Sequence, residues 1–188
     1  MAPAANTNDA KQPAQEEPLR LHIGGLEPKA GWKIFNIQPG PNVDFVGDCG
    51  SLGQFADGSV AQIYASHVYE HLGHREELPA ALKEAHRVLQ DGGLLQVSVP
   101  NFVAIARMIA EPQRTPQEQY MLLCHLFGAQ ADAHDFHKSG LTAKLLALFL
   151  RRAGFRTIRR VQRFDLFDDW SGRQRFGRPI SLNIEATK

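Results

Sequence analysis

Two short segments of the sequence carry several side chains that are capable of acid–base or metal chemistry. The first is Ser66–His71 (SHVYEH), and the second is His134–His137 (HDFH). Histidine exchanges a proton near neutral pH and is also a common metal ligand. His67 and His71 fit the H-x-x-E-H pattern of certain zinc peptidases, which hold zinc between two histidines on one helix. The segment directly follows a strand-like run, so we expect neither a peptidase nor a metal site.

The elements around Ser66–His71 predict how its side chains are positioned. The segment follows the apolar run Ala61–Ala65, and apolar residues then recur with helical spacing over His74–Gln90. We expect Gly92-Gly93 to end this helix. Leu94–Val99 is almost continuously apolar, which is typical of a parallel strand buried on both faces. Ligands of open α/β sheets bind at the carboxyl ends of strands, so a ligand crevice is expected at Ser66–His71.

The rest of the chain predicts one α/β domain. Strands are expected at Leu19–Ile23, Lys33–Ile37, Val43–Val46, Gln62–Ala65, Thr157–Phe164 and Ile180–Ala186; helices are expected at Ile105–Phe127, broken around Pro112 and Pro116, and at Leu141–Ala153. Strands that alternate with helices favour a mostly parallel sheet. The first three strands lie too close together in sequence for full helices between them. Residues 1–18 are rich in Ala, Pro and Gln, which predicts a disordered tail before the domain at 19–188.

Composition narrows the classes of protein and partner. The chain has 188 residues and a formal net charge of +1, so we expect no nucleic-acid or membrane-surface binding. Cys49 and Cys124 show no metal-ligand spacing, and the sequence shows neither a secretory signal nor a membrane-spanning run. We therefore expect a cytoplasmic protein. Trp170 lies among arginines near the C-terminus, which indicates a homodimer or protein partner through the C-terminal region.

In these segments the chain resembles the class I S-adenosylmethionine-dependent methyltransferases. The likeness is strongest to a compact bacterial branch of predicted methyltransferases with a methyltransferase type 11-like domain, and it covers residues 19–164. It is carried by LHIGG (Leu21–Gly25), Gly31-Trp32, Asp48-Cys49, SHVYEH, RVLQDGGLLQVSVPN (Arg87–Asn101), FGAQADAHDFHKSGLT (Phe127–Thr142) and AGF (Ala153–Phe155). The resemblance implies a single-domain Rossmann-like fold whose mostly parallel seven-stranded sheet carries helices on both faces.

The resemblance also implies a cofactor, a reaction and site residues. The cofactor would be S-adenosylmethionine, and its methyl group would pass to an oxygen or nitrogen of a small-molecule or saccharide acceptor. His71 and His137 would lie on the acceptor side as catalytic residues, with His137 as the base that removes a hydroxyl proton. The cofactor-binding residues would be Gly24, Gly25, Asn36, Asp48, Cys49, Ser66 and His67.

Two residues depart from the family pattern. Leu26 stands where the family has a further glycine in its first turn. Asn36 stands where an acidic residue holds both ribose hydroxyls, and an amide carries no charge. These departures favour an alternative, in which the chain is a catalytically inactive methyltransferase-like fold that serves as a binding or assembly module.

Overall fold

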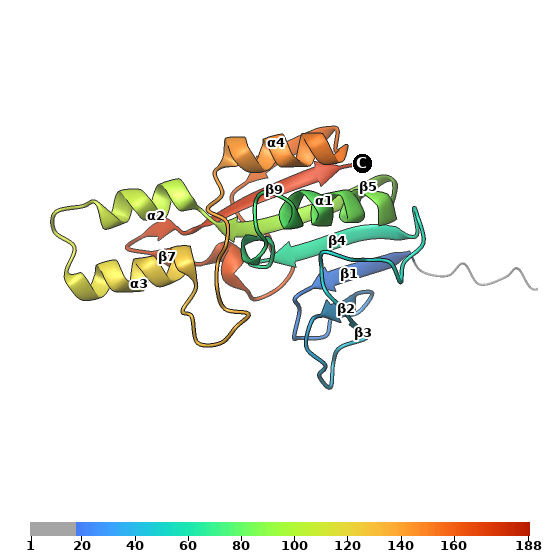
Figure 1. Cartoon of the computed structure of the whole chain (residues 1–188), viewed down its shortest axis with the longest axis horizontal. Coiled ribbons are helices and arrows are strands. Elements are labelled where there is room, and N and C mark those ends of the chain that lie inside the picture. The colour runs from blue at the N-terminus through green and yellow to red at the C-terminus, as the bar shows by residue number, and fades with distance from the viewer. Residues whose placement is uncertain (1–17) are drawn as a thin grey trace, which may run out of the picture.

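The computed structural model describes residues 18–188, so the predicted tail lies outside the described residues except for Pro18. Seven strands form one sheet in the order β3-β2-β1-β4-β5-β9-β6 (Figure 1). The first five strands in sequence pair in parallel, and β9 pairs antiparallel with both β5 and β6. The strands are β1 (Leu19–Ile23), β2 (Lys33–Asn36), β3 (Phe45–Val46), β4 (Val60–Ser66), β5 (Leu89–Pro100), β6 (Thr157–Val161) and β9 (Ser181–Thr187).

The helices confirm the predicted break at the prolines. The described chain has α1 (Glu77–Val88), α2 (Phe102–Ile109), α3 (Pro116–Phe127) and α4 (Ala143–Ala153), with short 3-10 turns η1 (Tyr69–His71) and η2 (Trp170–Gly172) and a small hairpin of β7 (Gln174–Arg175) and β8 (Arg178–Pro179). Thr115 and Glu118 form a capping box at the start of α3, and Pro116 occupies the first turn, where it costs no hydrogen bond. No helix among residues 18–188 has the length and apolar character needed to cross a membrane.

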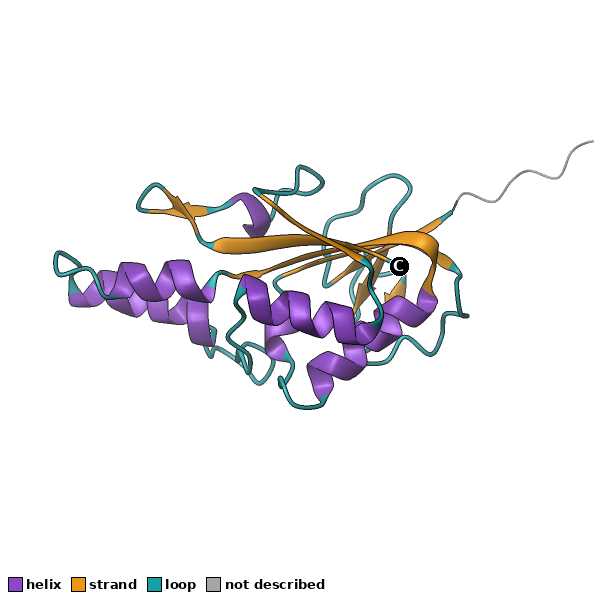
Figure 2. Cartoon of the chain, turned by 90° about the horizontal axis from the view of Figure 1, so that it is seen from above, coloured by secondary structure: helices purple, strands orange, loops and turns teal. Residues whose placement is uncertain are grey.

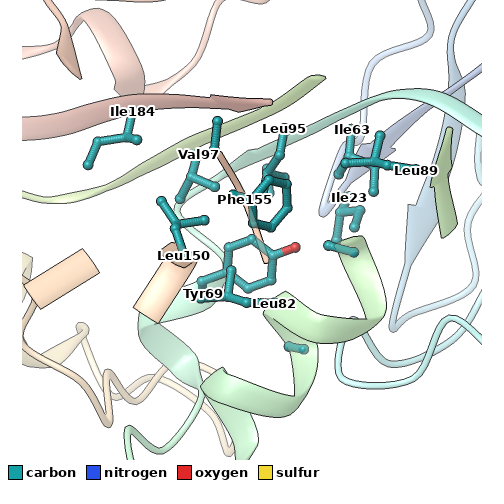
Figure 3. Close-up of a cluster of buried hydrophobic side chains, with 14 of the residues drawn as sticks. Ile23, Ile63, Tyr69, Leu82, Leu89, Leu95, Val97, Leu150, Phe155 and Ile184 are labelled. Atoms are coloured by element: carbon teal, nitrogen blue, oxygen red, sulfur yellow. The ribbon is translucent and has the colours of Figure 1, made fainter. Parts of the chain in front are cut away.

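The main core lies between the sheet and the pair α1 and α4. Alternate strand residues such as Ile63, Leu95 and Ile184 face these helices, and Leu82 and Leu150 meet them from the helix side (Figure 3). All five side chains are buried. This packing fixes the strands firmly at the edge where the polar segment of Ser66–His71 begins.

The expectation of helices on both faces of the sheet is wrong. In Figure 2, α1 and α4 lie beneath the sheet, and no α-helix of the described chain covers the opposite face. The connections Gly24–Trp32 and Ile37–Asp44 contain no helix because they are too short to hold one, as the spacing of the first strands predicts. Part of this face carries a polar ladder, in which Gln96 bonds to both Gln62 and Glu185.

The predicted end of the first long helix is also wrong. α1 ends at Val88, and Leu89 is already extended because it pairs with Val60 at the start of β5. Gly92, with φ of +76°, therefore forms a bend within β5 and does not cap the helix. Pairing with a neighbouring strand, which local sequence does not reveal, sets this boundary.

Candidate functional site

Two cavities open at the carboxyl edge of the parallel strands, and Gly24 lines both. The first, which we call the strand-edge crevice, has a volume of about 280 Å³, and six of the predicted residues line it: Gly24, Asn36, Asp48, Cys49, His67 and His71. The second, which we call the aromatic pocket, has a volume of about 510 Å³, and its wall includes Gly24, Gly25, Ser66, Phe167, Trp170 and Arg175. His137 lines neither cavity.

The turn after β1 is closely packed and needs glycine. Gly24 has a φ of +76°, and its N–H donates to the carbonyl of Phe35 at 2.8 Å. A Cβ atom at Gly24 would lie 2.5 Å from Cγ2 of Val68, too close for any real contact. Leu26 does not block the site, because its side chain is 73% exposed at the rim of the aromatic pocket.

Asn36 braces the glycine turn. Its Nδ2 donates to the carbonyl of Gly25 at 3.0 Å, and its Oδ1 accepts from the N–H of Gln38 at 3.1 Å. The Asn36 donor group is therefore engaged within the protein, and Oδ1 is its remaining polar atom toward the crevice. A carboxylate at this position could not donate to Gly25, which explains physically why an amide suits this turn.

The loop after β3 forms one wall of the strand-edge crevice, and Asp48 and Cys49 lie in this wall. Asp48 Oδ1 accepts from the N–H of Gly50 at 2.7 Å, so this carboxylate also stabilises its own turn. Burial, with the nearby Asp48 charge, raises the pKa of the Cys49 thiol to about 12. Cys49 is therefore a neutral packing residue at this wall and not a nucleophile.

His67 is held in a strained backbone conformation directly after β4. It has a φ of +55°, which is rare for a residue other than glycine and occurs often at functional sites. Its Nε2 lies 2.9 Å from Oγ of Ser181, and its Nδ1 lies 3.2 Å from Oε1 of Glu70. Ser66, the preceding residue, has a buried hydroxyl without a hydrogen-bond partner among the described residues.

Glu70 organises the second half of the segment. Its backbone carbonyl accepts from the N–H groups of Lys138 and Ser139, which joins η1 to the loop that contains His137. His71 and His137 stack edge-to-face, with their ring centroids 4.7 Å apart. Burial lowers the pKa of His137 more than the neighbouring Glu70 charge raises it. The segment forms a 3-10 turn, and the helix that the zinc-peptidase pattern requires is not present in it.

The wall of the aromatic pocket contains residues that the sequence did not single out as site residues. Tyr64 donates its hydroxyl to Oδ2 of Asp169 at 2.5 Å, and Asp169 Oδ1 accepts from the N–H of Ser171 at 2.8 Å. His22 packs against Phe167 with ring centroids 3.9 Å apart, and burial lowers its pKa to about 4. The run of aromatic and acidic residues from Phe164 to Trp170 could have indicated this pocket in the sequence. Its contact with β1 and β4, however, depends on the fold and is not visible in the sequence.

A mostly parallel sheet of this order, with a glycine turn and a crevice at its carboxyl edge, defines the class I S-adenosylmethionine-dependent methyltransferase fold. The family model described as "Methyltransferase domain" matches residues 28–97. No curated protein is similar enough in sequence to match. The chain is therefore similar to a methyltransferase domain over residues 28–97, and its described residues have the fold of the S-adenosylmethionine-dependent methyltransferases.

Solved structures with the same fold are distant in sequence. A SAM-dependent methyltransferase from Archaeoglobus fulgidus is 18% identical, with a TM-score of 0.56 over 90% of this chain and 86% of that one. A methyltransferase from Haloferax volcanii, solved in complex with the Trm112 methyltransferase activator, is 15% identical, with a TM-score of 0.55 over 95% and 85%. A SAM-dependent methyltransferase from Aquifex aeolicus is 14% identical, with a TM-score of 0.51 over 92% and 82%.

The residues present fit S-adenosylmethionine, the cofactor of this class. Gly24 lines both cavities, and a ligand can approach its backbone closely because glycine has no side chain. The unpartnered Ser66 hydroxyl lies at the wall of the aromatic pocket next to this turn, where a polar ligand group can satisfy it. Leu26 leaves the turn open, as described above.

Proposed function

We propose that this chain transfers a methyl group from S-adenosylmethionine to an oxygen or nitrogen of a small, carbohydrate-like acceptor bound in the aromatic pocket. The observation that carries the proposal is the shared wall at Gly24, which lines both cavities. A nucleoside in the strand-edge crevice and an acceptor in the aromatic pocket would meet at this residue. Alignment of two bound reactants can supply most of the acceleration of a displacement reaction.

Residues of both cavities would contact the cofactor. Asn36 Oδ1 and Asp48 would contact its nucleoside part in the crevice, and Ser66 and the Gly24-Gly25 turn would contact its amino-acid part. When bound, the cofactor supplies an activated methyl group on a sulfonium. The chain's own task is to fix the position of that group and to exclude water around it.

The walls of the aromatic pocket suit a hydroxylated acceptor. The Trp170 side chain is 41% exposed, and Phe167 lies in the same wall, so both offer apolar surface to the C–H face of a sugar ring. Asp168 and Arg173, 3.1 Å apart, supply an acceptor and donors for hydroxyl groups. This mixture of an apolar platform with a few polar groups is typical of small-molecule sites.

Asp168 is our choice for the group that accepts the acceptor's proton. Its carboxylate lines the aromatic pocket, whereas both oxygens of Asp169 are engaged by Tyr64 and Ser171. His71 and His137 are the sequence-based candidates for this role, but neither lines this pocket. Proton removal is secondary in this proposal, because positioning dominates the reaction.

The experiment uses the two tryptophans of the chain. Trp32 is 8% exposed and packs against Tyr64, whereas Trp170 lies at the pocket. Calorimetry first measures binding of S-adenosylhomocysteine. Monosaccharides, with catechol as a non-sugar comparison, are then titrated while tryptophan fluorescence is recorded. We expect sugar-dependent quenching that Trp170→Phe removes and Trp32→Phe keeps.

The alternative is a catalytically inactive binding module, and the observation in its favour is the engaged amide of Asn36. No binding heat and no thermal shift with millimolar S-adenosylmethionine or S-adenosylhomocysteine would establish the module and remove the proposed transfer. Cofactor binding without quenching by any sugar would retain the enzyme class and reject the carbohydrate acceptor.

A protein partner through the C-terminal region is a further part of this proposal. The structure of the Haloferax volcanii methyltransferase with its activator shows that a protein of this fold binds a partner. In the present chain Phe176, at the tip of the β7–β8 hairpin, is the exposed aromatic residue we expect at such a contact. Sedimentation of the full chain with and without Phe176→Ser tests whether a second copy binds there.

A further inference from the structure

The side chain of Glu70 is the starting point, because it is a fully buried carboxylate whose nearest cationic partners are histidines. Glu70 is 0% exposed, and neither Oε1 nor Oε2 makes a well-formed hydrogen bond among the described residues, although His67 Nδ1 lies 3.2 Å from Oε1. An ionised carboxylate in such a place costs several kcal/mol, by order of magnitude, unless a positive charge compensates it. A buried polar group without a partner calls for a specific explanation, such as an ion.

Two histidines offer ring nitrogens beside this carboxylate. One ligand atom each of Glu70, His71 and His137 can be chosen so that all three lie within 4.8 Å of one another. The Nε2 atom of His137 is 4.0 Å from Oε1 of Glu70. The Nδ1 atom of His71 lies 3.2 Å from the backbone carbonyl of Phe136, which leaves Nε2 of His71 available. Metal-binding histidines are usually oriented by such a bond from the second ring nitrogen to a carbonyl.

We propose that Glu70, His71 and His137 bind a divalent transition-metal ion, with zinc as the best match to two imidazoles and one carboxylate. Two nitrogen ligands and one carboxylate oxygen are a common zinc donor set, and such a site leaves a fourth position for water or a ligand. His71 also lines the strand-edge crevice, so the metal would lie beside the crevice. A small movement of the side chains would shorten the present separations to coordination distances.

The proposed ligand set differs from the one that the H-x-x-E-H pattern predicts. In that pattern His67 and His71 would hold the metal, but the two ring nitrogens of His67 contact Ser181 and Glu70, and His67 is not in the cluster. His137 is distant in sequence and reaches Glu70 because the loop after α3 folds back onto η1. The metal would therefore join this loop to the end of β4 at the side of the crevice.

His67 provides the competing explanation for the buried carboxylate. Its Nδ1 lies 3.2 Å from Oε1 of Glu70, so a protonated His67 would supply the positive charge without a metal. The two explanations differ in which histidine Glu70 depends on. Variants of His67 and His137 therefore separate them.

The experiment measures metal binding directly on the full chain. The protein is first stripped with a chelator, and Zn²⁺ is then titrated by calorimetry, while Co²⁺ is added in parallel to record the visible absorption of a coordinated ion. We expect one ion per chain. Glu70→Gln and His137→Asn should each lower the affinity at least about 100-fold, and His71→Asn should do the same.

Two control variants keep the test specific. His134→Asn changes a histidine of the same loop that lies outside the cluster. His67→Asn removes the competing partner of Glu70, and asparagine tolerates the positive φ of this position. Both should bind Zn²⁺ within about tenfold of wild type, on the scale of an outer-shell change. Circular dichroism verifies that each variant is folded. If Glu70→Gln or His137→Asn fails to fold, His71→Asn still tests the ligand set, because His71 lies at the wall of the crevice.

The outcomes decide between the two explanations. No binding by folded wild-type protein overturns the metal site, as does binding that Glu70→Gln leaves intact or that His67→Asn abolishes. Binding of S-adenosylhomocysteine is measured on the same samples. Wild-type protein that binds S-adenosylhomocysteine but no zinc therefore rejects this inference alone and leaves the proposed methyl transfer standing.

Discussion

Replacement of Gly24 by alanine tests the packing of the first turn most sharply. The alanine must adopt the left-handed φ of +76° that Gly24 has, which costs roughly 1–2 kcal/mol. Its Cβ would also lie 2.5 Å from Cγ2 of Val68, and overpacking of this kind costs about 1–3 kcal/mol. We therefore expect Gly24→Ala to lower the free energy of unfolding by about 2–5 kcal/mol, the sum of the two costs.

A second substitution separates the two costs. Val68→Ala removes Cγ2, and the next Val68 atom, Cβ, lies 3.9 Å from the new methyl, an ordinary contact. In the double variant only the backbone strain should remain, so a double-mutant cycle should give a favourable coupling of about 1–3 kcal/mol. Gly177→Ala is the matched control, because its φ of +71° imposes the strain with no atom within 4 Å.

Urea unfolding measures these free energies, and calorimetry with S-adenosylhomocysteine measures the effect on the crevice. Gly24→Ala should weaken binding at least about tenfold, which corresponds to about 1.4 kcal/mol, because it displaces Val68 from the crevice wall. Additivity of Gly24→Ala and Val68→Ala within about 0.5 kcal/mol would refute the steric reasoning. A cost for Gly24→Ala equal to that for Gly177→Ala would do so as well.

Three further predictions concern the surroundings of the two cavities. Asn36→Ala removes the hydrogen bonds to Gly25 and Gln38, so thermal or urea unfolding should show a loss of about 1–2 kcal/mol; Asn36→Asp should also be less stable than wild type, because it loses the donor to Gly25. Tyr64→Phe removes a hydrogen bond to the Asp169 carboxylate and should cost about 1.5–3 kcal/mol, whereas Tyr120→Phe on the exposed face of α3 should change stability by less than about 0.5 kcal/mol. The pKa of His22, about 4 in the folded protein against 6.5, means that its stability contribution is complete above pH 6.5 and is lost as pH falls toward 4. Wild type should therefore lose up to about 3 kcal/mol more than His22→Gln over this interval in urea unfolding, and parallel curves would contradict the assignment.

The order of the helices and strands, and the edge of the sheet that carries the site, were predictable because they depend on local sequence patterns. Apolar periodicity located α1, and the near-continuous run Leu94–Val99 located the buried part of β5. Capping residues and prolines divided α2 from α3. The sequence also predicted that the residues after β1 and β4 would lie together, since parallel strands end at one edge.

The remaining features depend on contacts between distant segments. Nothing local to Gly92 shows that the strand begins before it, because the pairing of Leu89 with Val60 decides that boundary. Similarly, the approach of His137 to Glu70 requires the folded loop, and the bond from Tyr64 to Asp169 requires the segment after β6 to cross the sheet. Helices on both faces were expected from the resemblance, although the short connections around β2 had no room for them.

The face of the sheet that no α-helix of the described chain covers has a consequence for the evolution and engineering of this protein. Helices support the strand edge from one side, and on the other side Phe167, from the segment after β6, packs against His22 and Trp32. A longer connection at Gly24–Trp32 would therefore have to displace this segment, and no helix. A helix grafted at that connection would thus replace the segment after β6 as the cover of this face, while the core between the sheet, α1 and α4 stays intact.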